Sequence, residues 1–248
     1  MLTIKNQAEI EKMRRAGYIV AEVLALMAEM VRPGITTKDL DIAAEKLIRS
    51  RGARPLFLGY GGFPASICAS VNEQVVHGIP GDRVLKAGDI ISIDVGAEKN
   101  GYCGDAARTF AVGEIDPETR RLLEVTELSL QKGWEQAVCN NRLGDIAHSV
   151  QKTVEKAGFS VVRDYTGHGI GKRMHEDPAV PNYGKAGSGM KLVNGMALAI
   201  EPMVNMGTHK VITLSDGWTV VTKDLMPSAH FENTVAITPK GPRLLTVL

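Results

Sequence analysis

The sequence has few of the features that mark disulfide-rich or zinc-finger proteins. Its 248 residues include only three cysteines, which are widely spaced and form no CxxC pair: Cys68, Cys103 and Cys139. An odd number of scattered cysteines is typical of a reducing compartment and argues against a disulfide framework or a cysteine zinc site. We therefore expect a cytoplasmic protein with free thiols.

The sequence also lacks long hydrophobic runs and an excess of one charge. No apolar run approaches the ~18 residues that a membrane span needs, and the net charge is +1. Charged residues such as Glu9, Lys12 and Arg14 interrupt the first segment, which is therefore not expected to be a signal peptide. This balance predicts a globular protein without affinity for membranes or nucleic acids.

Several common catalytic motifs are missing. There is no GxSxG, no P-loop and no GxGxxG after a strand. The HED at 175–177 is not HExxH, because residue 179 is Ala and Pro178 would disrupt the required helix. The GHGIG at 167–171 resembles a weak phosphate-binding loop, but the lysine and hydroxyl pattern of such loops is absent.

Hydrophobic spacing predicts the same order of elements twice: two helices followed by strands. Asn6 and Glu9 resemble a capping box at the start of the first helix, and Asp116-Pro117 is a good start for the third. The strands include ASICASV, IISIDVG and AARTFAV, and further strands are expected after Gly158. The helices are predicted over residues 7–31, 37–52, 117–137 and 142–157.

The two halves also match in sequence. LKAGDIISIDVG (85–96) aligns with LVNGMALAIEPM (192–203), so that Asp94 matches Glu201. Alternation along a strand places each carboxylate on the face opposite its large apolar neighbours. With no Pro-, Gly- or Ser-rich linker, we expect one compact α/β domain over 1–248, with halves of about 1–112 and 113–248.

Four carboxylates lie in or beside apolar strands, where burial is costly unless they are paired or bind a cation. Taken singly, each could cap a turn or pair with an arginine. Together with a glycine-flanked histidine they meet the needs of two divalent ions about 3.5–4 Å apart, which lower the pKa of a shared water. Such ligands suit Mn, Fe, Co or Zn without selecting one. The residues are Asp94, Asp105, Glu201, Glu232 and His168.

The stretch YTGHGIGKRMHEDP (165–178) carries two histidines seven residues apart. Its glycines and Pro178 disfavour a helix, so His168 and His175 are expected on a turn or an irregular strand. His175 and His77, the latter in NEQVVHGIP, are candidates for groups that orient a substrate.

Over essentially all its residues the sequence resembles type I methionine aminopeptidases, in the bacterial single-domain form. The matching stretches are GYGGFPASICASVNEQVVHGIP, GDIISIDVGAEKNGYCGD, YTGHGIGKRMHEDP, ALAIEPMV and HFENTVAIT. The resemblance implies the pita-bread fold, an α/β fold with pseudo-twofold symmetry and a dinuclear metal site between its halves. It also implies removal of the N-terminal methionine from nascent polypeptides whose second residue is small.

The resemblance assigns a role to each candidate metal ligand. It implies that Asp94 chelates one ion, that Asp105 and Glu232 bridge both ions, and that His168 and Glu201 complete the second ion. Glu201 would also take the proton of the attacking water.

Substrate-binding roles follow from the same resemblance. It implies that His175 stabilises the scissile carbonyl, and that His77 contacts the substrate backbone or helps proton transfer near the leaving amine. The pocket for the methionine side chain would be formed by Tyr60, Phe63, Cys68 and Trp218. Trp218 could instead be a plain core aromatic, and Cys68 a small buried apolar residue.

Two positions depart from the expected pattern. Met174 replaces an aromatic that relatives commonly carry, which puts the fine substrate preference in doubt. Cys103 lies two residues before Asp105, so in a strand the two share a face, and oxidation of this thiol could affect the site.

Three alternatives stay open. One is a proline-directed aminopeptidase P or prolidase, although those relatives usually carry an N-terminal domain, for which the sequence leaves no room before residue 64. The others are a pita-bread protein that binds partners without catalysis and a binding module with one tightly held ion. We expect a monomer, and the function suggests docking at the ribosome, although no segment shows it.

Overall fold

A computed structural model describes residues 2–248 and contains helices at the four predicted places. None of these helices is long and apolar enough to cross a membrane. A 3-10 turn spans Tyr60–Gly62. The α-helices are α1 Gln7–Met30, α2 Thr37–Ser50, α3 Pro117–Trp134 and α4 Leu143–Lys156.

Within residues 2–248 the strands form four antiparallel sheets. In one sheet β4 lies between β1 and β2 and also pairs with β5, and the largest sheet has the order β15-β14-β9-β7-β8. The strands are β1 Arg54–Pro55, β2 Ile67–Val71, β3 Gln74–Val76, β4 Ile90–Lys99, β5 Tyr102–Ala111, β6 Ser160–Val161, β7 Gly167–Gly169, β8 Glu176–Val180, β9 Ala197–Ile200, β10 Met203–Asn205, β11 Val211–Thr213, β12 Val220–Thr222, β13 Ser228–His230, β14 Asn233–Thr238 and β15 Gly241–Leu244.

The predicted helix starts are confirmed. The Asn6 side chain accepts from the Glu9 backbone N–H while the Glu9 carboxylate accepts from the Asn6 N–H, which is a complete capping box. The Asp116 side chain accepts from two backbone N–H groups, and Pro117 occupies the first turn. Helices α1 and α3 therefore begin where side chains satisfy the free backbone donors.

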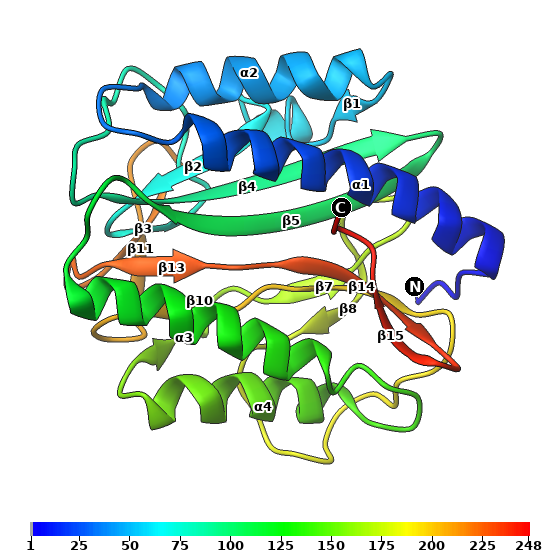
Figure 1. The fold of residues 1–248 in the computed structure, drawn as a ribbon. Helices are drawn as coiled ribbons and strands as arrows, with labels where there is room; N and C mark the ends of the chain where they lie inside the picture. Colours follow the sequence, from blue (N-terminus) through cyan, green and yellow to red (C-terminus); the bar gives the residue numbers. More distant parts are fainter. Residues whose placement is uncertain (1) are drawn as a thin grey trace.

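The helices cover the strands from two sides (Figure 1). One hydrophobic cluster packs α1 and α2 against β2 and β4 through residues such as Val20, Ile48 and Ile93. A second cluster packs α3 and α4 against β9 and β14 through Leu122, Ile146 and others. The strands between the two helix pairs are therefore enclosed, and their inner residues are shielded from solvent.

The two large sheets meet between the helix pairs. The Glu232 backbone N–H donates to the Ala107 carbonyl at 2.9 Å, and the Thr234 hydroxyl donates to the Asp105 carbonyl at 2.8 Å. These bonds join the start of β14 to β5, although the two segments are far apart in the sequence. The division into halves at residue 112 stays a prediction.

Candidate active site

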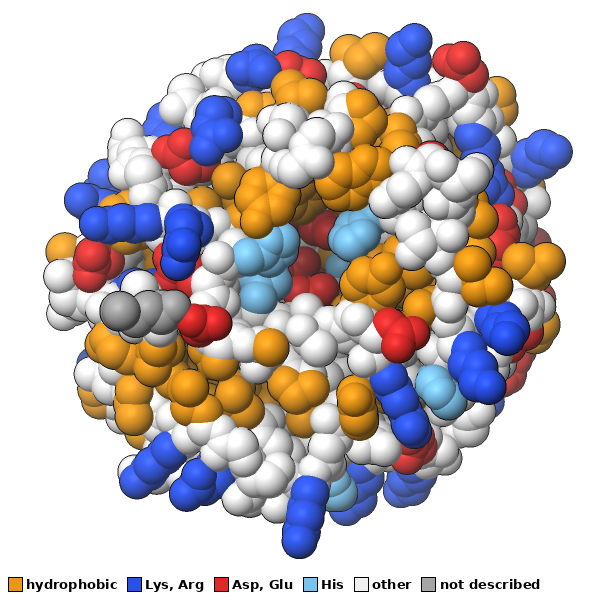
Figure 2. Space-filling view, turned by 180° about the vertical axis from the view of Figure 1, so that it is seen from behind, with side chains coloured by type: hydrophobic (Ala, Val, Ile, Leu, Met, Phe, Trp, Pro, Cys, Tyr) orange, Lys and Arg blue, Asp and Glu red, His pale blue; other side chains and the backbone are white. Residues whose placement is uncertain are grey.

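All the residues predicted for the site line one pocket of about 160 Å³. Figure 2 shows a hollow with acidic side chains on its floor and histidines and hydrophobic side chains at its sides. The lining residues are Phe57, Tyr60, Phe63, Cys68, His77, Asp94, Asp105, His168, Met174, His175, Glu201, Trp218 and Glu232.

Strand pairing brings the four carboxylates into this pocket. Asp94 lies in β4 and Asp105 in β5, where antiparallel pairing sets Asp105 opposite Gly96. Glu201 and Glu232 adjoin the paired ends of β9 and β14, where Ile200 pairs with Asn233. The β5 strand begins at Tyr102, earlier than predicted, because Asn100 and Gly101 form a tight hairpin turn with positive φ.

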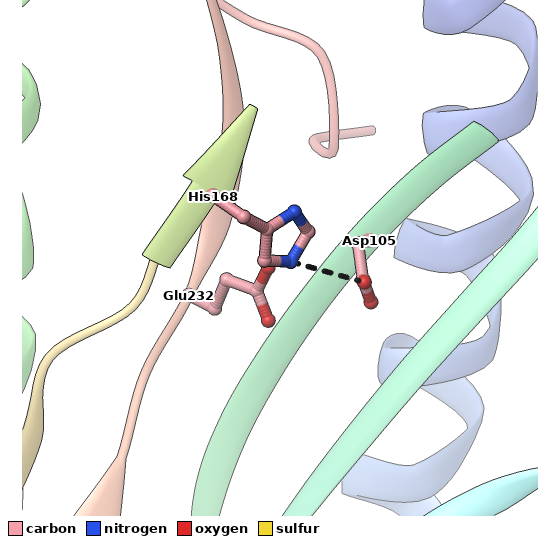
Figure 3. A group of neighbouring side chains, drawn as sticks. All are labelled: Asp105, His168 and Glu232. Atoms are coloured by element: carbon pink, nitrogen blue, oxygen red, sulfur yellow. Dashed lines mark ion pairs between the residues drawn. The ribbon is translucent and has the colours of Figure 1, made fainter. Parts of the chain in front are cut away.

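The His168 imidazole faces three of these carboxylates. Ligand atoms of Asp105, His168 and Glu232 all lie within 4.8 Å of one another (Figure 3). His168 Nε2 is 3.5 Å from Glu201 Oε1 and 4.0 Å from Asp105 Oδ2. Its Nδ1 is 2.9 Å from the Gly169 carbonyl oxygen, which fixes the ring and leaves Nε2 to face the acids.

Three carboxylate oxygens in this cluster are buried without a hydrogen-bond partner among residues 2–248. They are Asp94 Oδ1, Asp105 Oδ1 and Glu232 Oε1. A buried polar atom without a partner is costly, and a carboxylate more so. Oxygen atoms that converge with one imidazole form a donor set suited to divalent metal ions. The cluster therefore fits a cation that would satisfy these atoms.

The electrostatics of the cluster agree with this fit. Burial raises the pKa of Asp94 to about 7, although the Asp105 carboxyl and the Val95 N–H act in the opposite direction. Burial and then repulsion by neighbouring carboxylates raise the pKa of Asp105, Glu201 and Glu232 well above their ordinary values. A bound cation would favour the charged forms, so binding would release protons.

Two glycines allow His168 to lie so close to the other strands. A side chain at Gly167 would overlap the Ala199 carbonyl of β9, and one at Gly169 would overlap the Asp177 carbonyl of β8. His168 therefore lies on a short irregular strand between two others, as expected for this stretch.

His175 and His77, the two histidines predicted to orient a substrate, also line the pocket. His175 Nδ1 is 2.7 Å from the Tyr60 hydroxyl, and the His175 ring centre is 4.3 Å from that of His168. Burial lowers the pKa of His175. His77, with a positive φ of 59°, lies edge-on to the Trp218 ring at 6.4 Å. Both imidazoles thus line the same pocket as the carboxylates and the apolar side chains.

The remaining wall of the pocket is apolar. The Phe63 and Trp218 rings meet edge to face with their centres 5.2 Å apart, and Cys68 and Met174 are buried beside them. Burial raises the pKa of the Cys68 thiol well above its ordinary value, so this thiol acts as a small apolar group. Cys103 lines a neighbouring groove, with its Sγ 3.6 Å from the Lys172 carbonyl.

Sequence reasoning missed two residues of the site. Phe57 lines the apolar wall, and no motif distinguishes it from a core aromatic. His230 is 1% exposed, with Nε2 3.8 Å from Glu201 Oε2. Strand alternation does not relate it to Glu232, because β13 ends at His230 and β14 begins only at Asn233.

Comparison with known proteins places this geometry in a family. The sequence matches the profile of Metallopeptidase family M24 over residues 11–239. It is 60% identical to a methionine aminopeptidase of Clostridium acetobutylicum over 248 residues, which is 100% of this chain and 99% of the relative. A methionine aminopeptidase of Clostridium perfringens is 58% identical over 248 residues and the full length of both chains.

Solved structures agree with the sequence comparison. The crystal structure of a methionine aminopeptidase from Thermotoga maritima superimposes with a TM-score of 0.98 at 46% identity, covering 100% of both chains. The predicted α/β fold, the pita-bread fold, is thereby confirmed. The chain belongs to metallopeptidase family M24.

Proposed function

We propose that this protein is a methionine aminopeptidase, which removes the N-terminal methionine from polypeptides whose second residue is small. The observation that carries the proposal is one pocket that combines four buried or partly buried carboxylates and His168 with an apolar wall. The full-length relatives with 58% and 60% identity, both methionine aminopeptidases, support it. A proline-directed peptidase and a non-catalytic binding protein are the alternatives that the experiment below must separate.

The carboxylates and His168 would hold two divalent ions. In the proposed set Asp94 would serve one ion, His168 and Glu201 would serve the other, and Asp105 and Glu232 would be shared by both. The unpartnered oxygens of Asp94, Asp105 and Glu232 support these roles. When bound, the ions supply a hydroxide nucleophile near neutral pH. The donor set allows Co, Mn, Fe or Zn.

The chain's own residues would bind and polarise the substrate. Glu201 is the proposed acceptor for the proton of the attacking water, because its carboxylate lies among the ligands. His175 would donate a hydrogen bond to the scissile carbonyl as negative charge develops there, and the Tyr60 hydroxyl beside its Nδ1 orients the ring. His77, which lines the same pocket, would contact the substrate backbone or help proton transfer near the leaving amine.

The apolar wall would receive the methionine side chain. Phe63 and Trp218 offer ring edges and faces, and the buried Cys68 supplies a small polarisable contact. Tyr60 borders the same space. A thioether that packs against this wall would place the first peptide bond beside the residues proposed to hold the ions. This geometry would restrict cleavage to the first residue.

We further propose that the protein acts as a monomer on nascent chains in the cytoplasm. The three free cysteines fit a reducing compartment.

The first experiment is release of free methionine from Met-Ala-Ser after chelation and after adding back Mn, Fe or Co. Met-Leu-Ser and an Ala-Pro peptide serve as controls. Metal-dependent cleavage of Met-Ala-Ser alone supports the proposal, whereas cleavage of Ala-Pro alone assigns a proline-directed enzyme. No cleavage by a folded, metal-loaded protein favours a binding protein, and bound-metal stoichiometry distinguishes one ion from two.

Two variants connect the activity to the site. Glu201→Gln removes the proposed proton acceptor and is expected to lower kcat by roughly 10²- to 10⁴-fold. His175→Ala removes the proposed carbonyl donor and is expected to lower kcat by roughly 10²- to 10³-fold. Wild-type rates in either variant would remove that residue from the mechanism.

A further inference from the structure

A buried ion pair lies next to the pocket and has no part in the mechanism above. Lys5 Nζ is 2.9 Å from Glu176 Oε2, and the two side chains are only 5% and 3% exposed. The Thr3 hydroxyl donates to the same oxygen, while the Arg173 backbone N–H donates to Glu176 Oε1 at 3.2 Å. Glu176 is therefore held by three donors from two separate segments.

The pair joins the start of the chain to the loop that carries His175. Glu176 directly follows His175 and begins β8. Lys5 lies before α1, and its backbone N–H donates to the Gly195 carbonyl at 2.8 Å. Gly195 has a φ of +87°, and a side chain there would come within 2.6 Å of the Lys5 carbonyl oxygen. The segment that presents Lys5 is thus itself fixed to the body of the protein.

The last glycine of GHGIG makes room for this pair. A Cβ at Gly171 would lie 2.6 Å from Lys5 Cε and 2.7 Å from Glu176 Oε1. The Gly171 carbonyl accepts from the Cys103 N–H of β5 at 2.8 Å, which holds the other end of the loop. The loop 171–175 is therefore anchored at Gly171 by β5 and at Glu176 by Lys5.

A buried ion pair adds little stability compared with well-packed apolar residues of similar size. Its geometric effect is specific, however, because three directed bonds fix the carboxylate next to the His175 backbone. We propose that Lys5 is a positioning residue, which acts through Glu176 to hold His175 beside His168 in the pocket. This inference rests on the proposed role of His175.

The test removes both charges together, in the variant Lys5→Met/Glu176→Met, so that no unpaired charge is left buried. We expect the variant to fold and to bind Mn with wild-type affinity, because no proposed metal ligand is changed. Misplacement of His175 is expected to lower kcat on Met-Ala-Ser by roughly 10- to 100-fold with little change in KM. Amide hydrogen exchange in residues 171–175 is expected to become faster.

A mutant cycle with His175→Ala separates positioning from a general structural effect. If Lys5 acts through His175, adding Lys5→Met/Glu176→Met to His175→Ala lowers kcat no further than His175→Ala does alone. The matched control is Lys132→Met/Glu135→Met, a partly exposed pair of the same 2.9 Å length, which is expected to leave kcat and exchange unchanged. Two results would overturn the inference. One is a wild-type kcat in Lys5→Met/Glu176→Met, and the other is a kcat in the triple variant with His175→Ala that falls by the product of the two separate losses.

Hydrogen exchange keeps this inference distinct from the proposed function. If the wild-type protein cleaves no peptide, the proposed function fails. Hydrogen exchange in wild type and in Lys5→Met/Glu176→Met still shows whether the Lys5–Glu176 pair holds the loop 171–175. Unchanged exchange in residues 171–175 would then overturn the positioning role as well.

Discussion

At the scale of single residues, the glycines of GHGIG each have a separate packing role. Gly167 makes room for the Ala199 carbonyl, Gly169 for the Asp177 carbonyl and Gly171 for the Lys5–Glu176 pair. The two carbonyls belong to the strands on either side of β7, so they cannot move without breaking the sheet. Gly167 and Gly169 thus let His168 take its position because they have no side chain to clash with the neighbouring strands.

Gly169→Ala tests this packing. The added methyl group would overlap backbone of β8, and overpacking of this kind is expected to lower the free energy of unfolding by about 1–3 kcal/mol. Denaturant unfolding measures the change. Gly81→Ala is the control, because nothing lies within 4 Å of a Cβ there. Equal losses in the two variants would contradict the packing role.

Glu176 gives the protein a pH-dependent contribution to stability. Burial raises the pKa of its carboxyl, but hydrogen bonds from Lys5 and Thr3 outweigh burial and bring the pKa below the ordinary value of 4.5. Because the folded-state pKa is depressed, the stabilisation is present above pH 4.5 and is lost as pH falls through the folded-state pKa. Glu176→Gln lacks this titration.

The difference in free energy of unfolding between wild type and Glu176→Gln should therefore shrink as the pH is lowered below 4.5. Urea unfolding at a series of pH values measures it. If the difference in free energy of unfolding stays constant as the pH falls until both proteins unfold, the carboxylate is not held by its donors in the folded state.

At the scale of elements, the helices are defined by local signals. The Asn6–Glu9 capping box and the Asp116-Pro117 start lie where the sequence predicts them, because a cap depends only on residues within one turn. The predicted end of α3 was less accurate. Residues 135–137 leave the helix, and the following segment turns through Asn140, which has a φ of +76°.

Asn6→Ala tests the first cap. The side-chain acceptor for the Glu9 N–H is lost, and this is expected to lower the free energy of unfolding by about 1 kcal/mol. Thermal unfolding measures the change. Asn6→Asp keeps an acceptor oxygen and should unfold near the wild-type temperature; a loss as large as that of alanine would argue against the cap.

At the scale of the whole molecule, the site depends on the meeting of two sheets. Asp94 and Asp105 come from the sheet covered by α1 and α2, and Glu232 adjoins the sheet covered by α3 and α4 (Figure 1). Bonds between β5 and the start of β14 set the distance between these acids. A ligand of all these acids would therefore also hold the two sheets together.

Metal binding should accordingly stabilise the entire fold. At a free metal concentration of 100 times Kd, the stabilisation expected from mass action is about 2.7 kcal/mol. Thermal unfolding with Mn and after chelation measures it. The variant Asp105→Asn/Glu232→Gln removes two proposed ligands and should show no metal-dependent shift. A wild-type protein that unfolds at the same temperature with and without Mn would contradict the proposed centre.

Much of this protein could be read from its sequence because the relevant signals are short-range. Hydrophobic periodicity predicts the four helices, and carboxylates in apolar strands indicate the residues that now line the pocket. The matching LKAGDIISIDVG and LVNGMALAIEPM stretches indicate that Asp94 and Glu201 occupy related places. Composition and spacing alone were enough to choose the residue types that a metal site needs.

Only the tertiary structure decided which residues meet across the chain. Lys5 and Glu176 are separated by 171 positions, so no local pattern could pair them. Phe57 and His230 join the site for the same reason, and Cys103 lines a neighbouring groove although strand alternation places it near Asp105. Local sequence fixes φ, ψ and side-chain periodicity, whereas contacts between distant segments depend on how whole sheets and helices pack.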